Sequence, residues 1–154
     1  PMSAESRLAS LGLTLPDAMA PVANYVPFVA ADGLLSISGQ IAKTADGRLI
    51  TGRLGADLDV AAGQEAARAC ALNILAQVKL ALGDLDRVAR VVKLGGFVRC
   101  TEDFTDQPAV INGASDLMVE VFGAAGRHSR AAVGVNALPL GVAVEIDALI
   151  AIGA

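Results

Sequence analysis

The chain is poor in the residues that nucleic-acid-binding surfaces need. Its 154 residues include no tryptophan, one tyrosine and four phenylalanines, so few rings are present on which bases could stack. Acidic residues outnumber Lys and Arg by 16 to 12, which gives a net charge of −4, and the cations form no cluster. Because phosphate binding depends on grouped positive charge, we expect no nucleic-acid partner.

Cysteine and histidine are equally scarce. Cys70 and Cys100 lack the close spacing of metal ligands, and His128 is the one histidine in the sequence. A structural zinc site needs four such ligands, so we expect no metal, and nothing in the sequence calls for an organic cofactor. We predict that both cysteines are buried, reduced thiols, which indicates a cytoplasmic protein.

Long hydrophobic runs are also missing, although the mean hydropathy is +0.56. The most apolar stretch, residues 131–144, is interrupted by Asn136, Pro139 and Gly141, whereas a membrane-spanning helix needs about 20 apolar residues. The beginning of the chain does not look like a secretory signal. We therefore expect neither a membrane partner nor export.

What the chain does have is an apolar fraction of 54% with only 18% charged residues. Globular proteins average about 45–50% and about 25% respectively. A chain of 154 residues fits one domain and has too much surface to bury such an excess alone. We expect part of it to lie in a subunit interface, which makes the protein an oligomer.

Local patterns predict a sequence of helices and strands. Asp32-Gly33 between two apolar runs predicts a hairpin, Asp59 and Gly83 predict the two ends of a long helix, and Asp106 with Pro108 predicts the start of another. We expect helices within residues 3–11, 57–83 and 107–122, and strands at residues 22–30, 34–40, 87–100, 129–138 and 142–152, with a short additional strand at 48–52.

This order predicts an α+β domain in which two helices pack on one face of a mixed β-sheet. The chain supplies too little to cover the other face, so another subunit is its natural cover. Gly95-Gly96, in the middle of a predicted strand, indicates a bulge or the close approach of another group.

The last two strands alternate in a way that suggests a site. Ala131, Val133 and Val135 share one face and are expected to be buried, which leaves Arg130 beside small residues on the other face. In the final strand Glu145 alternates with apolar residues. An arginine beside small residues leaves room for a carboxylate to accept two hydrogen bonds. A cross-strand ion pair of Arg130 with Glu145 or Asp147 is the open alternative.

The segment S-R-A-A-V-G-V-N-A-L-P-L-G-V-A-V-E-I-D-A, residues 129–148, resembles the C-terminal signature of the RidA/YjgF family, whose members are also labelled L-PSP endoribonucleases. S-G-Q at 38–40, D-F-T at 103–105 and V-I-N at 110–112 fall in register with it. The resemblance covers the chain from Val22 onward. Within a single domain spanning residues 1–154, residues 1–21 form an additional helix and loop.

The resemblance implies a chorismate-mutase-like fold, a homotrimer and a ligand cleft between neighbouring subunits. It implies that Arg130 binds the carboxylate of an imino or keto acid, and that Glu145 positions or activates water. The other residues for which the resemblance implies contact with the substrate are Tyr25, Ser38, Gly39, Asn112 and Ala132. From the residues alone, Tyr25 is equally a packed or interfacial aromatic, Asn112 a polar residue of the first helical turn, and residues 38–40 a strand end.

The activity implied is that of an enamine/imine deaminase, which hydrolyses reactive 2-imino acids to 2-keto acids and ammonia. Two positions depart from the family pattern: Ala132 stands where a cysteine is frequent, and Ser115 where an aromatic residue is frequent. A non-catalytic protein that binds small carboxylates on the same trimer is therefore an alternative, and an endoribonuclease is a further one. We predict that His128 lies on a solvent-facing loop.

Overall fold

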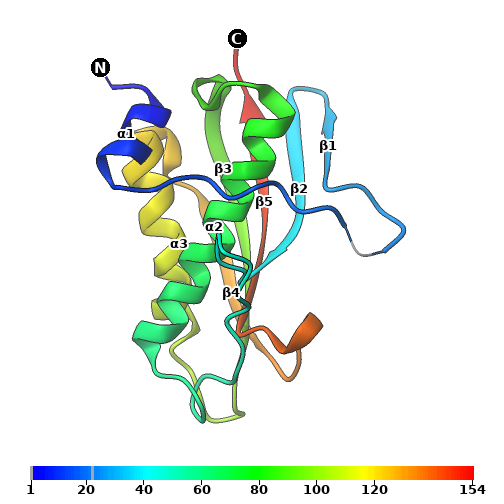
Figure 1. Cartoon of the computed structure of the whole chain (residues 1–154), viewed down its shortest axis with the longest axis vertical. Helices are drawn as coiled ribbons and strands as arrows, with labels where there is room; N and C mark the ends of the chain where they lie inside the picture. Colours follow the sequence, from blue (N-terminus) through cyan, green and yellow to red (C-terminus); the bar gives the residue numbers. More distant parts are fainter. Residues whose placement is uncertain (1, 22) are drawn as a thin grey trace.

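The computed structural model describes residues 2–21 and 23–154 (Figure 1). The helices are α1 (Ala4–Ser10), α2 (Val60–Leu82) and α3 (Gln107–Phe122). The strands are β1 (Phe28–Ala31), β2 (Leu34–Ile41), β3 (Val88–Arg99), β4 (Ser129–Val135) and β5 (Val144–Ile152). Short 3₁₀ turns occupy Leu85–Arg87, Gly123–Gly126 and Pro139–Gly141.

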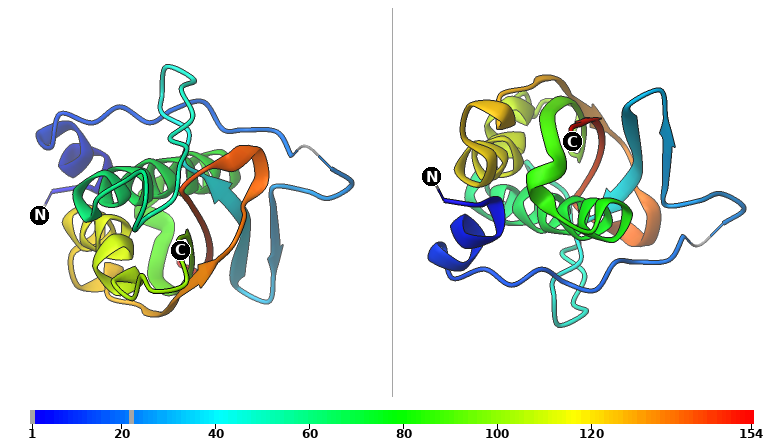
Figure 2. Two further views of the ribbon diagram at one scale, coloured as in Figure 1. Left: turned by 90° about the horizontal axis from the view of Figure 1, so that it is seen from below. Right: turned by 90° about the horizontal axis from the view of Figure 1, so that it is seen from above.

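The five strands form one mixed sheet in the order β1-β2-β5-β3-β4. All neighbours are antiparallel except β3 and β4, which run parallel. Both long helices lie on the same side of this sheet, as the end-on views along the strands show (Figure 2). The predicted α+β architecture is confirmed. No helix within residues 2–21 and 23–154 covers the second face of the sheet, which we call the open face.

Helix α2 begins and ends at the residues expected from the sequence. The Asp59 carboxylate accepts a hydrogen bond from the backbone N–H of Ala62 at 2.8 Å, and Gly83 closes the helix in a left-handed conformation with φ of 78°. Helix α3 starts at Gln107 as predicted, with Pro108 in its first turn. Asp106 occupies the N-cap position without a side-chain hydrogen bond, so its side chain does not cap that helix.

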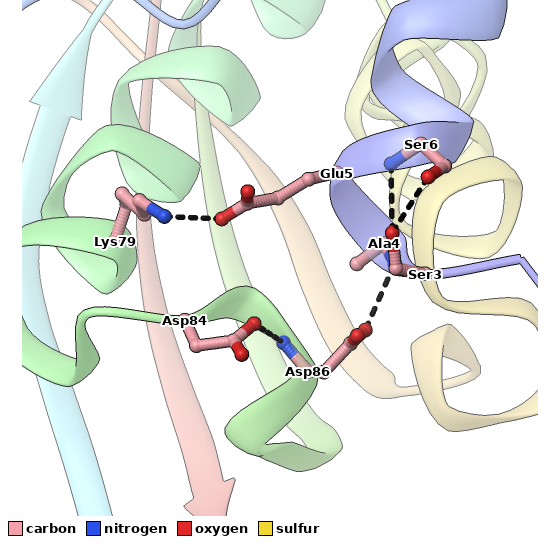
Figure 3. Close-up of polar contacts among 7 residues, drawn as sticks. All are labelled: Ser3, Ala4, Glu5, Ser6, Lys79, Asp84 and Asp86. Atoms are coloured by element: carbon pink, nitrogen blue, oxygen red, sulfur yellow. Dashed lines mark hydrogen bonds and ion pairs between the residues drawn. The ribbon is translucent and has the colours of Figure 1, made fainter.

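Helix α1 is attached to the rest of the fold by polar contacts (Figure 3). Ser3 caps it by accepting from the backbone N–H of residue 6. The backbone N–H of Ala4 donates to Asp86 at 2.9 Å, and Glu5 forms an ion pair with Lys79 near the end of α2. After α1 the chain crosses the outer side of α2 (Figure 1). The N-terminal extension is therefore docked against the domain.

Two strand predictions need correction. The predicted start of the first strand at Val22 lies outside the described residues. Residues 23–27 form no strand. Strand β1 begins only at Phe28, after Pro27, which lacks the N–H that a ladder needs. Residues 48–52 form isolated bridges and no strand. The hairpin itself is confirmed, because Asp32 and Gly33 both have positive φ, 52° and 75°, as a tight turn between antiparallel strands requires.

The core lies between the sheet and the two long helices. Cys70 and Cys100 are free and buried in it, as predicted, and the Cys70 thiol lies 3.4 Å from the carbonyl oxygen of Val144. Among the described residues, no helix is long and apolar enough to span a membrane. No three His, Cys, Asp or Glu side chains in that part of the chain gather as metal ligands would.

Candidate functional site

Arg130 and Glu145 belong to strands that are not neighbours. Strand β3 lies between β4 and β5, and it pairs Leu94 with Arg130 and Phe97 with Glu145. Leu94 is fully buried against the helices, so Arg130 points to the helix side of the sheet. Phe97 is three residues further along β3, so Glu145 points to the open face. The alternative, a cross-strand ion pair of Arg130 with Glu145 or Asp147, is therefore absent from the described residues.

The inserted strand also reverses the predicted burial of β4. Ala131, Val133 and Val135 pair with Gly95, Phe97 and Arg99 and lie on the open face, where Val133 is 45% exposed. We had expected this face to be the buried one. Alternation correctly sorted the side chains into two sets, but the pairing with β3 decided which set faces the helices. In β5 the prediction holds, since Val144, Ile146, Ala148 and Ile150 are all buried.

Arg130 is held by helix α3. Its Nη1 donates to the hydroxyl of Ser115 and its Nη2 to the carbonyl oxygen of Pro108, both at 3.0 Å. Pro108, Asn112 and Ser115 are four and three residues apart and share one side of the helix. This spacing places the exposed Asn112 beside the guanidinium, well inside the helix rather than in its first turn. Ala132, also on the helix side, is half-buried next to Arg130 on β4.

His128 is half-buried and hydrogen-bonded, which corrects the prediction of a solvent-facing loop. Its Nε2 lies 2.8 Å from the hydroxyl of Ser115, and its Nδ1 lies 2.6 Å from the carbonyl oxygen of Gly126. Sequence reasoning had noted Ser115 only as a departure from a family pattern and had not connected it with His128. A signal was available: both residues flank predicted site residues, one near Asn112 and the other two positions before Arg130.

Glu145 lies in a separate cavity of about 490 Å³. Tyr25, Ser38 and Gly39, three of the residues predicted from the resemblance, line the same cavity, and so does the exposed Leu140 of the turn before β5. Tyr25 is 50% exposed, which excludes the alternative of a packed core aromatic within the chain. Ser38 donates from its hydroxyl to the carbonyl oxygen of Val26 at 2.7 Å and is thereby fixed in the cavity wall.

Gly39 makes room for the Glu145 carboxylate. A Cβ at position 39 would lie 2.2 Å from Glu145 Oε2 and 2.9 Å from its Cδ, distances that real Cβ atoms do not adopt. Gly95 does the same for Asp147, since a Cβ there would lie 2.3 Å from Asp147 Oδ1. A Cβ on Gly96 would meet Ile111 of α3 at 2.7 Å. The close approach predicted for Gly95-Gly96 is confirmed, and Gly39 has a steric role that the sequence did not reveal.

The environment of Glu145 raises the pKa of its carboxyl group. Burial raises the pKa of the Glu145 carboxyl, and the neighbouring Asp147 carboxylate raises it further. Burial also raises the pKa of Asp147, against the lowering effects of the Gly95 backbone N–H and of Lys93. A carboxyl group whose pKa is shifted upward exchanges protons more readily near neutral pH, which suits a general acid–base residue.

Gln40 is a second polar group in this cavity wall, and it was not among the predicted site residues. It is 4% exposed and donates from Nε2 to the carbonyl oxygen of Ser38 at 3.0 Å. Its Oε1 is buried without a hydrogen-bond partner among the described residues. A buried acceptor of this kind usually has a partner, so Gln40 Oε1 is an unsatisfied polar atom on the strand that pairs with the Glu145 strand.

Each chain thus carries two separate candidate sites: Arg130 on the helix side of β4, with N–H groups that find no partner among the described residues, and the Glu145 carboxyl group in a cavity on the opposite face. The fold is that of a small mixed α+β protein, and comparison with known proteins identifies its family. Residues 5–150 match the sequence profile of the family described as "YjgF/chorismate mutase-like, putative endoribonuclease". The chain belongs to this family, and its resemblance to RidA/YjgF proteins is confirmed.

Individual relatives agree with this assignment. Protein TCP17 of Trypanosoma cruzi is 55% identical over 146 residues, which are 94% of this chain and 91% of TCP17. The crystal structure of Atu1372 from Agrobacterium tumefaciens, a protein of unknown function, is 51% identical with a TM-score of 0.89, covering 97% of this chain and 93% of that one. The YjgF gene product of E. coli is 26% identical with a TM-score of 0.63, covering 88% and 93%.

Proposed function

We propose that the protein is an enamine/imine deaminase whose active site forms between two copies of the chain, Arg130 from one copy and Glu145 from its neighbour. The observation that carries the proposal is the division of the candidate residues between two faces. Tyr25, Ser38, Gly39 and Glu145 line one cavity, while Arg130, Asn112 and Ala132 lie on the other side of the sheet. A single copy cannot bring both groups to one small ligand.

The open face supports the assembly that this proposal requires. It carries apolar side chains that a monomer leaves in contact with water, including Val133 at 45% and Leu34 at 39% exposure. Contact between two different patches of identical chains generates a closed ring when the rotation closes. We propose a ring of three copies, in which each interface joins the Arg130 half-site of one copy to the Glu145 cavity of the next.

The chemistry needs only these groups and water. The guanidinium of Arg130 has five N–H donors, of which helix α3 uses two, and the remaining three have no partner within the described residues. They suit the carboxylate of a 2-imino acid. With the imine protonated, Glu145 takes a proton from water as the oxygen attacks the imine carbon, which gives a tetrahedral carbinolamine. Glu145 then returns this proton to the nitrogen. As the C–N bond breaks, the hydroxyl group gives its proton to Glu145 and becomes the carbonyl of a 2-keto acid, ammonia leaves, and Glu145 releases the proton to solvent.

Mixed oligomers test this arrangement directly. Arg130→Ala and Glu145→Gln are each expected to abolish ammonia release from 2-aminoacrylate-type imines while the oligomer stays intact. When the two variants are unfolded together in equal amounts and refolded, about one quarter of the interfaces pair an intact Arg130 with an intact Glu145, so about a quarter of the activity returns. A site contained within one chain would recover none of it.

Size and binding measurements complete the test. Light scattering should give three times the chain mass of 15.6 kDa. Saturable binding of a 2-keto acid without any turnover would instead indicate a non-catalytic carboxylate-binding protein. An endoribonuclease is disfavoured by the net charge of −4. Ribonuclease activity that persists through purification and disappears in Glu145→Gln would reverse that conclusion.

A further inference from the structure

The contacts of Ser115 form a chain of hydrogen bonds whose directions are all determined when the His128 imidazole is neutral. The carbonyl oxygen of Gly126 can only accept, so the Nδ1 atom of His128 at 2.6 Å must carry the hydrogen. In a neutral imidazole Nε2 is then an acceptor, and the Ser115 hydroxyl at 2.8 Å donates to it. The Ser115 oxygen in turn accepts from Arg130 Nη1 at 3.0 Å. The order is Arg130 to Ser115 to His128 to Gly126.

We propose that Ser115 and His128 are positioning residues that fix the guanidinium of Arg130 for carboxylate binding. This inference rests on the proposed function and deepens it. His128 orients the Ser115 hydroxyl by accepting its hydrogen, which turns the oxygen lone pairs toward Arg130. The carbonyl oxygen of Pro108 accepts a hydrogen bond from Arg130 Nη2 at 3.0 Å. Nη1 and Nη2 each donate one hydrogen bond to helix α3, so the orientation of the guanidinium plane is fixed before a ligand binds. The Arg130 side chain therefore loses less conformational entropy on binding.

A serine beside a histidine also suggests a nucleophile, and the geometry argues against it. The Ser115 oxygen already accepts a hydrogen bond from a guanidinium, which withdraws the electron density that an attack on a carbonyl carbon needs. The partner of His128 Nδ1 is a backbone carbonyl rather than a carboxylate, so this partner supplies no negative charge to stabilise an imidazolium. We therefore expect no loss of deaminase activity and no adduct at Ser115 after treatment with phenylmethylsulfonyl fluoride.

The positioning role predicts a particular kinetic pattern. In Ser115→Ala the guanidinium keeps only its contact with Pro108, and the carboxylate is bound less well in the ground state and the transition state alike. A net hydrogen-bond contribution of ordinary size corresponds to an increase of about three- to tenfold in KM, with kcat changed by less than about twofold. Ser115→Thr keeps the hydroxyl and should restore the parent KM. Ser129→Ala is the matched control, because the exposed Ser129 hydroxyl donates to Val92 instead.

The hydrogen-bond chain can be tested without any substrate. His128 is the single histidine of the chain, so protein labelled with ¹⁵N-histidine gives ring resonances from one imidazole. In mildly alkaline buffer we expect the tautomer with the hydrogen on Nδ1, whereas free histidine favours Nε2. Ser115→Ala should move the Nε2 resonance, since it removes the hydroxyl that donates there, while Ser129→Ala should leave it in place.

The two readouts separate the inference from the proposed function. The inference is overturned if the parent shows the Nε2-protonated tautomer, or if Ser115→Ala binds pyruvate and turns over imines with the parent constants. Covalent labelling of Ser115 with loss of activity would overturn it in favour of a nucleophile. If the parent neither binds pyruvate nor releases ammonia from imines, the proposed function fails, and the role of Ser115 and His128 in ligand binding fails with it even where the tautomer is as expected.

Discussion

A single methyl group at position 39 should displace the carboxyl group of Glu145 without changing its chemistry. Gly39 lies in β2, and its φ is outside the left-handed region, so alanine can adopt the same backbone conformation. The new Cβ would stand 2.2 Å from Glu145 Oε2. The atom in the way is the end of a flexible side chain, so the carboxylate can move aside and the fold should remain intact.

The size of the effect follows from the size of this displacement. A separation of 2.2 Å has to grow to at least the shortest contacts that Cβ atoms make, about 3.0 Å, so the carboxylate moves by about 1 Å. A misplacement of about 1 Å of a reacting group costs on the order of 100-fold in rate. We expect Gly39→Ala to lower kcat/KM for imine hydrolysis by about that factor, while the thermal unfolding midpoint changes little.

Gly95→Ala is the matched control. Its Cβ would stand 2.3 Å from Asp147 Oδ1, so the same methyl group displaces a neighbouring carboxylate of the same strand that does not line the Glu145 cavity. The assay is ammonia release coupled to a dehydrogenase, with circular dichroism to check folding. We expect Gly95→Ala to stay within a few-fold of the parent. Full activity in Gly39→Ala, or equal losses in both variants, would refute the assignment of Glu145 as the reacting group.

Three further predictions concern charge and packing. Asp147→Asn removes a negative charge that raises the pKa of Glu145, so the acid limb of kcat/KM, which rises as Glu145 ionises, should move to lower pH in a pH–rate profile. Gly113→Ala places a Cβ 2.2 Å from the backbone oxygen of Gln64, where α3 meets α2, and should lower the free energy of unfolding in urea by about 1–3 kcal/mol. Asp59→Ala removes the cap of α2 and should cost about 1 kcal/mol in the same assay; an unchanged midpoint would contradict the capping role.

The helices could be predicted closely because their ends depend on nearby residues. Asp59 and Gly83 bound α2, and Pro108 marks the first turn of α3, through contacts within a few positions along the chain. The hairpin at Asp32-Gly33 is local for the same reason. The first strand was misplaced because apolar composition alone does not form a strand: residues 23–26 precede Pro27, and the β1–β2 ladder begins only at Phe28.

The candidate site residues came from motif register, and the structure assigned most of them to one of two places. Tyr25, Ser38, Gly39 and Glu145 share a cavity, which could not be predicted from segments so far apart in the sequence. The hydrogen bonds of His128 were missed because they depend on how helix α3 lies against the beginning of β4. Contacts of that kind follow from packing and leave no periodic signal.

The composition alone limits which chemistry the protein can carry out, because the chain has few aromatic residues, few cations, two isolated cysteines and one histidine. The sequence by itself determined the helices, the hairpin and the two sets of side chains on each of the last strands, because these depend on local backbone preferences and on a period of two. Only the tertiary structure decided that β3 separates β4 from β5. Strand pairing is non-local, and it alone sets which face of a strand is buried. It therefore placed Arg130 and Glu145 on opposite faces of the sheet.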